Sequence, residues 1–133
     1  MKTMTSMTCA ALLGLTLSAS AASANPANVE RVTEGLISAG MAIELGDQCR
    51  DVRVRMLRGI NFLQGLKSHL SDLGYSGREI DAFIDSDVEK DRLEAIARER
   101  LSDLGVVEGN GATYCTVARA QIAQGTQVGQ LLR

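Results

Sequence analysis

The sequence contains few of the residues on which metal and catalytic sites depend. Among 133 residues there are one histidine, one proline and no tryptophan, and aromatic residues make up 3%. A zinc or iron site built on two or three imidazoles is therefore excluded. The sequence also lacks a run of about eighteen apolar residues and any block of about five like charges, and its formal net charge is −2. These absences argue against an integral membrane protein and against a nucleic-acid-binding protein.

The first 24 residues have the three parts of a secretory signal peptide. Lys2 precedes an apolar stretch at 10–17, and the small residues Ala-Ser-Ala follow at 22–24. The apolar stretch is far shorter than the roughly twenty residues that span a bilayer. We therefore expect cleavage near Ala24, which would leave residues 25–133 as a single periplasmic or secreted domain with no stable membrane insertion.

Two of the three cysteines, Cys49 and Cys115, follow the predicted cleavage site. Removal of residues 1–24 takes away Lys2 and no acid, which leaves 13 basic and 16 acidic side chains and a net charge of −3. An exported protein meets an oxidising compartment, so we expect these two cysteines to form a disulfide. Closing so long a loop would stabilise the fold by about 4 kcal/mol. The alternative, a reactive or metal-binding thiol pair, has no Cys-x-x-Cys motif and no histidine nearby in the sequence to support it.

Apolar residues recur at spacings of three and four, which predicts an all-α protein: a compact bundle of about five helices closed by one long-range disulfide. The first helix follows Asn25 and Pro26, a cap and a proline suited to the first turn. Asp47 is predicted to cap a second helix that runs to Leu73 and ends before Gly74. Its core-facing stripe includes Cys49, Val52, Met56, Ile60, Leu63, Leu70 and Leu73.

Two capping boxes, Ser-Gly-Arg-Glu at 76–79 and Ser-Asp-Val-Glu at 86–89, predict the starts of a third and a fourth helix. Gly105 is placed to end the fourth helix. A fifth helix is expected from about Thr113, and a last turn carries Val128, Leu131 and Leu132.

No catalytic or metal-binding motif emerges from the polar residues. The acids at 85–91 lack the glycine and glutamate positions of an EF-hand and fit the start of a helix. His69 has Ser68, Ser71 and Asp72 nearby in sequence, but no nucleophile-elbow motif accompanies them. We therefore expect no enzymatic activity, no metal and no cofactor.

A helical wheel for the predicted second helix places four residues opposite its main stripe: Val54, Arg58, Phe62 and His69. One interpretation is that this helix is central and buried on both sides. The other is an exposed strip that binds a partner, with an arginine and an aromatic ring at its centre.

Charge is distributed unevenly along the chain. Residues 50–67 contain five basic and one acidic side chain, a sum of +4, whereas 79–94 contain two basic and seven acidic, a sum of −5. These segments are either solvated faces that attract each other within the fold or surfaces for a charged partner.

Several short motifs resemble those of a family of small exported bacterial proteins of unknown function. They are Gly-Asp-Gln-Cys at 46–49, Leu-Gly-Tyr-Ser at 73–76, Tyr-Cys at 114–115, Gly125 and Gly-Gln-Leu-Leu-Arg at 129–133. Members of that family sometimes carry a label as a subunit of the respiratory NADH dehydrogenase, of a type resembling a thioredoxin-like iron–sulfur protein. Such a cluster needs four cysteine ligands, which two remaining cysteines cannot supply.

A looser similarity, in size, compartment and cysteine count, is to small periplasmic acid-stress chaperones, which would expose apolar surface when their carboxylates are protonated. The sequence thus favours a non-enzymatic periplasmic helical protein that acts through a protein partner. An acid-activated chaperone is the alternative, and a small enzyme is the third hypothesis. The partner and the oligomeric state stay open.

Overall fold

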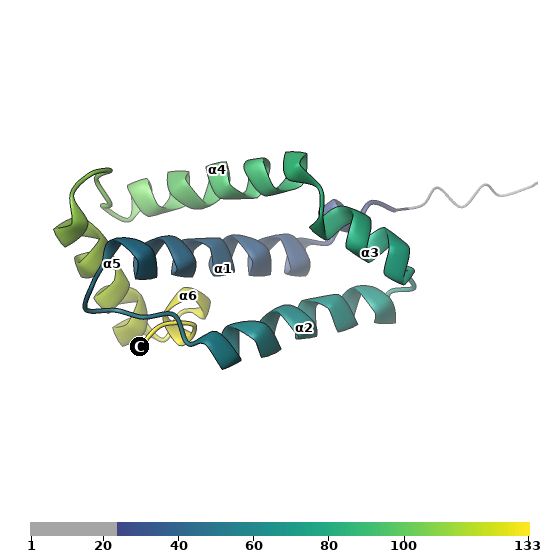
Figure 1. The fold of residues 1–133 in the computed structure, drawn as a ribbon, viewed down its shortest axis with the longest axis horizontal. Coiled ribbons are helices and arrows are strands. Elements are labelled where there is room, and N and C mark those ends of the chain that lie inside the picture. The colour runs from purple at the N-terminus through teal and green to yellow at the C-terminus, as the bar shows by residue number, and fades with distance from the viewer. Residues whose placement is uncertain (1–23) are drawn as a thin grey trace, which may run out of the picture.

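Helices account for nearly all the regular structure in residues 24–133, the part of the chain that the computed structural model describes (Figure 1). In chain order they are η1 (Pro26–Asn28), α1 (Glu30–Gln48), α2 (Met56–Asp72), α3 (Gly77–Ile84), α4 (Asp87–Asp103), α5 (Gly111–Gln124) and α6 (Gln127–Gln130). The predicted all-α class with five substantial helices is confirmed. The predicted signal peptide lies, apart from Ala24, outside the described residues.

Helix α1 is the centre of the bundle. It packs against α4 on one side and α2 on the other, while α5 crosses its C-terminal end, α6 lies beside its middle and α3 lies beyond the opposite end (Figure 1). Two glycines on α1 let its neighbours approach closely. A Cβ on Gly40 would lie 3.7 Å from the Ala97 Cβ of α4, and a Cβ on Gly35 would lie 2.7 Å from the Leu66 Cδ1 of α2.

The prediction that the second helix begins at Asp47 is wrong. Helix α1 continues through Gln48, and α2 begins only at Met56. Residues 49–55 form a connection that turns at 50–51 and then runs extended, here called the extended connection. The connection pairs with the distant end of the chain: the Arg53 N–H donates to the Arg133 carbonyl at 2.8 Å, and the Arg133 N–H donates to the Arg53 carbonyl at 2.9 Å. These backbone bonds replace helical ones, and they depend on residues far away in the sequence.

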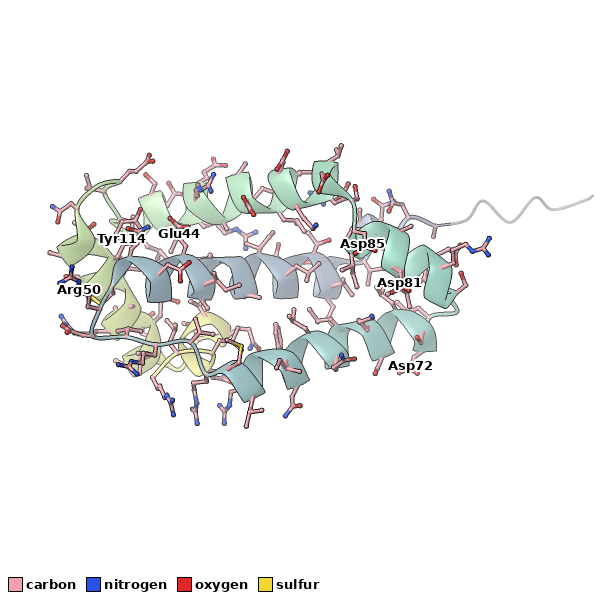
Figure 2. All side chains as sticks on the ribbon, viewed as in Figure 1. Glu44, Arg50, Asp72, Asp81, Asp85 and Tyr114 are labelled. Atoms are coloured by element: carbon pink, nitrogen blue, oxygen red, sulfur yellow. A yellow bond between two sulfur atoms is a disulfide. The ribbon has the colours of Figure 1, made fainter. Side chains whose placement is uncertain are left out.

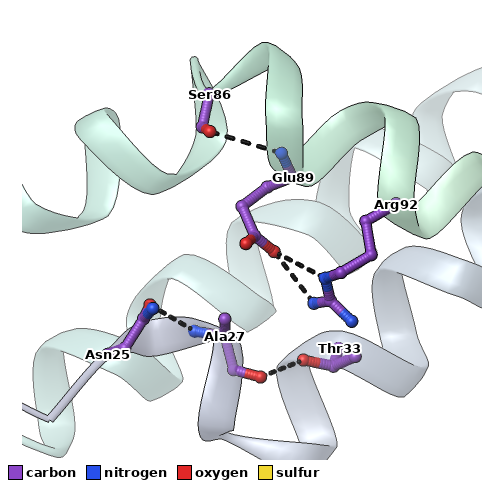
Figure 3. Close-up of polar contacts among 6 residues, drawn as sticks. All are labelled: Asn25, Ala27, Thr33, Ser86, Glu89 and Arg92. Atoms are coloured by element: carbon purple, nitrogen blue, oxygen red, sulfur yellow. Dashed lines mark hydrogen bonds and ion pairs between the residues drawn. The ribbon is translucent and has the colours of Figure 1, made fainter.

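The helix caps predicted from local sequence agree better with the structure. The Ser76 hydroxyl accepts from the Glu79 N–H at 3.2 Å and the Glu79 carboxylate accepts from the Ser76 N–H at 2.7 Å, so the predicted capping box at α3 is confirmed. At α4 the Ser86 hydroxyl accepts from the Glu89 N–H, whereas the Glu89 carboxylate accepts from Arg92 at 2.8 Å (Figure 3). Ser86 therefore caps α4 without the full reciprocal box.

The cap at Asn25 serves a shorter element than expected. Its side chain accepts from the Ala27 N–H at 3.0 Å and so caps the single 3₁₀ turn η1 (Figure 3). The Thr33 hydroxyl of α1 donates to the Ala27 carbonyl at 2.9 Å, which ties that turn to the first turns of α1.

The predicted disulfide between Cys49 and Cys115 is present, with an S–S distance of 2.03 Å and a sequence separation of 66. It joins the end of α1, not the start of α2, to the first turns of α5. The larger core cluster surrounds it, and a smaller cluster at the α3 end contains Val32, Leu70, Ile80 and Phe83. Within residues 24–133, no helix is both long and apolar enough to cross a membrane.

Candidate functional site

The four residues of the predicted partner strip do not form one surface. Val54 lies on the extended connection, half-buried and packed against the main core cluster. Phe62 is also half-buried against that cluster, and its ring lies beside Gly35 of α1. Arg58 faces solvent and donates a long hydrogen bond of 3.5 Å to the Gln130 carbonyl, while His69 is half-buried about three turns farther along α2.

A different surface stands out beside α1 and α2. The two helices are in tight contact at Gly35 and Leu66, and α2 diverges from α1 toward its own N-terminus (Figure 1). Between the C-terminal half of α1 and the N-terminal half of α2 lies a recess of about 490 Å³, here called the apolar groove. It is lined by Ala39, Ala42, Ile43, Gly46, Asp47, Val52, Arg53, Val54, Met56, Gly59, Ile60, Leu63 and Leu131.

Large apolar side chains on the groove walls remain exposed to solvent. Ile43 of α1 is 51% exposed, and Met56, Ile60 and Leu63 of α2 are 68%, 48% and 38% exposed. Met56, Ile60 and Leu63 belong to the stripe that the sequence predicts to face the core. That prediction holds for Cys49, Val52 and Leu70, which are buried. It is wrong for these three because α2 has moved away from α1 at their level, and it is wrong for Leu73, which is 54% exposed just after the end of α2.

A second recess, of about 880 Å³, adjoins the apolar groove and is here called the arginine cleft. Its lining combines three arginines with amide and apolar side chains: Arg55, Arg58, Arg133, Asn61, Gln127, Gln130, Met56, Leu57, Phe62 and Leu131. Met56 and Leu131 line both recesses, but Arg58 and Phe62 of the cleft lie on the face of α2 opposite Ile60 and Leu63 of the groove.

The arginines of this region lack acidic partners. Among residues 24–133, no ion pair involves Arg53, Arg55, Arg58 or Arg133. Several arginines elsewhere are paired: the Arg100 Nη1 lies 2.6 Å from the Glu34 Oε2, and the Arg119 Nη2 lies 2.9 Å from the Asp51 Oδ2.

The acidic segment gathers at the other end of the molecule. Asp72, Asp81 and Asp85 lie around α3, whereas Arg50 lies at the opposite end, beyond the end of α1 (Figure 2). Within the described chain one ion pair joins the basic segment 50–67 to the acidic segment 79–94, between Lys67 and Asp81 at 3.4 Å. The charge asymmetry therefore runs largely along the long axis of the bundle, and most of the basic segment stays unneutralised.

Titratable clusters elsewhere have structural explanations. The ligand atoms of Cys49, Asp51 and Cys115 lie within 4.8 Å of one another, but both sulfurs are committed to the disulfide. Tyr114 is buried close to Glu44 (Figure 2), and its pKa is raised, first by burial and then by the charges of Glu44 and Glu108, so its phenol keeps its proton at neutral pH.

No catalytic arrangement forms at the only histidine. Among the described residues no hydrogen bond joins the His69 side chain to Ser68, Ser71 or Asp72, the neighbours that the sequence offers for such chemistry. Because a nucleophile and its base must lie within hydrogen-bonding reach, this segment of α2 presents no nucleophile–base pair.

A sequence family described as a family of unknown function (DUF5333) matches residues 26–133. The chain belongs to this family. The resemblance to a helical family of unknown function is thereby confirmed, and the DUF5333 match includes every residue that lines the apolar groove and the arginine cleft. No curated protein and no solved structure matches the chain.

The sequence contained one local signal for this surface. From Val52 to Arg55 apolar and charged residues alternate, and in the structure Val52 is buried, Arg53 exposed, Val54 half-buried and Arg55 exposed. This is the period of an extended strand. Four residues were too few to outweigh the helical spacing on either side, and so the connection that frames both recesses was missed.

Proposed function

We propose that this protein is a non-enzymatic interaction module that binds one amphipathic helix of a partner protein in the apolar groove. The observation that carries the proposal is the exposure of Ile43, Met56, Ile60 and Leu63 around a single recess. Contiguous exposed apolar surface of this kind marks interaction sites, because leaving it in water is unfavourable.

A helix is the occupant that suits the groove best. Met56, Ile60 and Leu63 stand at spacings of four and three along one wall, and an amphipathic helix presents its anchors with the same spacing. The recess lies between α1 and α2, so a partner helix would complete a three-helix packing of the type found in bundles.

The disulfide supports the location that we propose for this interaction. Such bonds persist in oxidising compartments, which agrees with export to the periplasm or the medium and with a partner in the same compartment. It also ties the end of α1 to α5, while backbone bonds pair the extended connection with Leu131 and Arg133.

One observation favours the chaperone alternative. Glu34 of α1 and Arg100 of α4 form a bidentate ion pair at 2.6 and 2.8 Å, and the hydrogen bond from Arg100 lowers the pKa of Glu34. Strong acid would protonate Glu34 and remove this ion pair between α1 and α4. If this switch is functional, suppression of client aggregation should rise at low pH, and unfolding in acid without client protection would eliminate the chaperone alternative.

The proposal is tested by capture from periplasmic extract with a matched pair of variants. Ile60→Gln changes the groove wall, and Val88→Gln changes a 75% exposed residue on α4 at the acidic end. We expect one stoichiometric partner, identified by mass spectrometry, that Val88→Gln retains and Ile60→Gln loses. Retention by both variants would contradict the groove as the site, and many unrelated clients would favour the chaperone.

A further inference from the structure

The arginine cleft lies on the face of α2 that turns away from the apolar groove. Arg58, Asn61 and Phe62 line the cleft, and their spacings of three and four place them on one side of the helix. Ile60, on the groove wall, lies about half a turn around the helix from Arg58. The cleft is therefore a separate surface from the wall on which the proposed partner helix would lie.

The lining of the cleft carries charge of one sign. Among residues 24–133 it contains Arg55, Arg58 and Arg133 and no aspartate or glutamate. Each of four other recesses in this part of the chain includes at least one acid, Asp47 in the apolar groove and Glu34, Glu44, Glu108 and Asp103 in three smaller recesses. Because a cleft lined by one sign of charge focuses the electric field, the arginine cleft concentrates anions from solution.

The three arginines come from distant parts of the chain and are brought together by its folding. The Arg55 N–H donates to the Leu131 carbonyl at 2.8 Å, which places Arg133, two residues further on, in the segment beside Arg55. The Arg58 Nη1 donates to the Gln130 carbonyl at 3.5 Å, so this guanidinium group reaches from α2 to the end of α6. Gathering like charges costs stability through mutual repulsion, and a bound anion would relieve that repulsion.

The cleft also contains hydrogen-bond donors that the protein itself does not use. Among the described residues, four side chains of the lining make no hydrogen bond and no ion pair: Arg55, Arg133, Asn61 and Gln127. Guanidinium groups bind carboxylate and phosphate oxygens in bidentate geometry, and amide groups donate to the same oxygens. The cleft thus offers more donors and more positive charge than one singly charged anion can use.

We infer that the arginine cleft binds a small organic anion with at least two negative charges, either a phosphate monoester or a di- or tricarboxylate. A phosphate monoester carries a charge of about −1.5 to −2 at neutral pH, which suits a site with several guanidinium groups. The volume of about 880 Å³ lies within the range of small-molecule sites, about 300 to 1,000 Å³. This site would add a ligand to the proposed function and does not depend on the partner helix.

Two larger anions compete for the same arginines. An anionic bilayer presents its charges in a plane, whereas these arginines line a recess. A bilayer would instead use Leu57, which is 79% exposed and also lines the cleft, because an exposed apolar residue beside basic ones is typical of membrane-binding helices. An acidic segment of another protein is the second competitor, and it would bring the same carboxylates on a longer chain.

The experiment is isothermal titration calorimetry on the purified, disulfide-bonded protein with glycerol 1-phosphate, citrate and acetate. We expect glycerol 1-phosphate or citrate to bind about fivefold or more tightly than acetate, since each further charge pairs with a further arginine. The affinity should fall as the sodium chloride concentration rises. A smaller preference over acetate, or no binding of either multivalent anion, would overturn the inference.

A matched pair of double variants locates the binding site. Arg55→Gln/Arg58→Gln should weaken the bound anion about tenfold, because two exposed charge pairs together are worth about that factor. Arg50→Gln/Arg78→Gln removes the same charge from two exposed arginines that line neither recess, and it should leave the affinity unchanged. Equal urea-unfolding midpoints would show that both variants are folded. Equal weakening by both variants would mean that net charge alone attracts the anion, and the cleft would not be the site.

Two further titrations detect a larger occupant. If vesicles containing phosphatidylglycerol bind the protein when neither small anion does, and Leu57→Gln abolishes that binding, the occupant is a membrane. If a hexaglutamate peptide binds when neither small anion does, the occupant is an acidic protein segment. Either result overturns the small-anion site. The proposed partner helix would stand in both cases, because it rests on the opposite face of α2.

Discussion

Helix α1 packs against α4 on one side and against α2 on the other, and the two interfaces differ in what they leave exposed. At the α4 interface Ile37, Ala97 and Leu101 are each less than 5% exposed, and the ion pair between Glu34 and Arg100 bridges its edge. At the α2 interface the helices touch near one end and leave the apolar groove near the other. One helix therefore uses one side mainly for stability and the other for a surface that we propose binds a partner.

The largest expected effect concerns the disulfide between Cys49 and Cys115 at the end of α1. Replacing both cysteines by serine (Cys49→Ser with Cys115→Ser) should lower the free energy of unfolding by about 4 kcal/mol in the chain-entropy description. Urea unfolding of the wild type and of the double variant measures the difference. An unchanged midpoint would show that the bond contributes nothing to holding the end of α1.

A matched pair of truncations compares the two interfaces directly. Leu101→Ala, at a residue that is 1% exposed, should lower the free energy of unfolding by about 3 kcal/mol because it opens a cavity. Ile60→Ala, at a residue that is 48% exposed, should cost about 1 kcal/mol or less. Equal losses in thermal or urea unfolding would mean that the groove wall is core and would remove the contrast between the two sides.

A pair of glycine substitutions tests where α1 and α2 touch. Gly35→Ala would place a Cβ 2.7 Å from the Leu66 Cδ1, and the resulting overpacking should outweigh the gain in helix propensity and destabilise by about 1 kcal/mol. Gly65→Ala meets no atom within 4 Å and should stabilise α2 by up to about 1 kcal/mol. Stabilisation by both substitutions would show that the tight contact at Gly35 is absent.

These contacts also show what the sequence could and could not predict. The cap at Ser76 and the pairing of Cys49 with Cys115 were predicted, because a cap is decided within four residues and two exported cysteines have one possible pairing. The start of α2 was not predicted, because the extended connection before it is held by backbone bonds to Arg133. Helical spacing cannot anticipate such a long-range pairing. The groove was missed for a related reason: Met56, Ile60 and Leu63 have the spacing of a core stripe whether α1 covers them or leaves them open.

The smallest expected effect is the pH dependence of the stability that the interface between α1 and α4 contributes. The pKa of Glu34 in the folded protein lies below its ordinary value of 4.5, so the ion pair with Arg100 contributes fully above that value and its contribution is lost as the pH falls through the lowered pKa. Solvent screening of this partly exposed pair keeps the contribution below about 1 kcal/mol. Glu34→Gln should remove that part of the acid sensitivity in urea unfolding between pH 3 and 7, and an unaltered pH profile would contradict the role of the pair.

The central claim, that the open side of α1 is a binding surface, is tested most directly by nuclear magnetic resonance. An amphipathic helical peptide selected for binding to the protein is titrated into ¹⁵N-labelled protein, and the backbone amide shifts are followed residue by residue. We predict that the shifts concentrate at 43–47, 52–63 and 131–133, around the apolar groove, and that the α4 face stays unchanged. Shifts concentrated on α3 and α4, with none at Met56 or Ile60, would contradict the account.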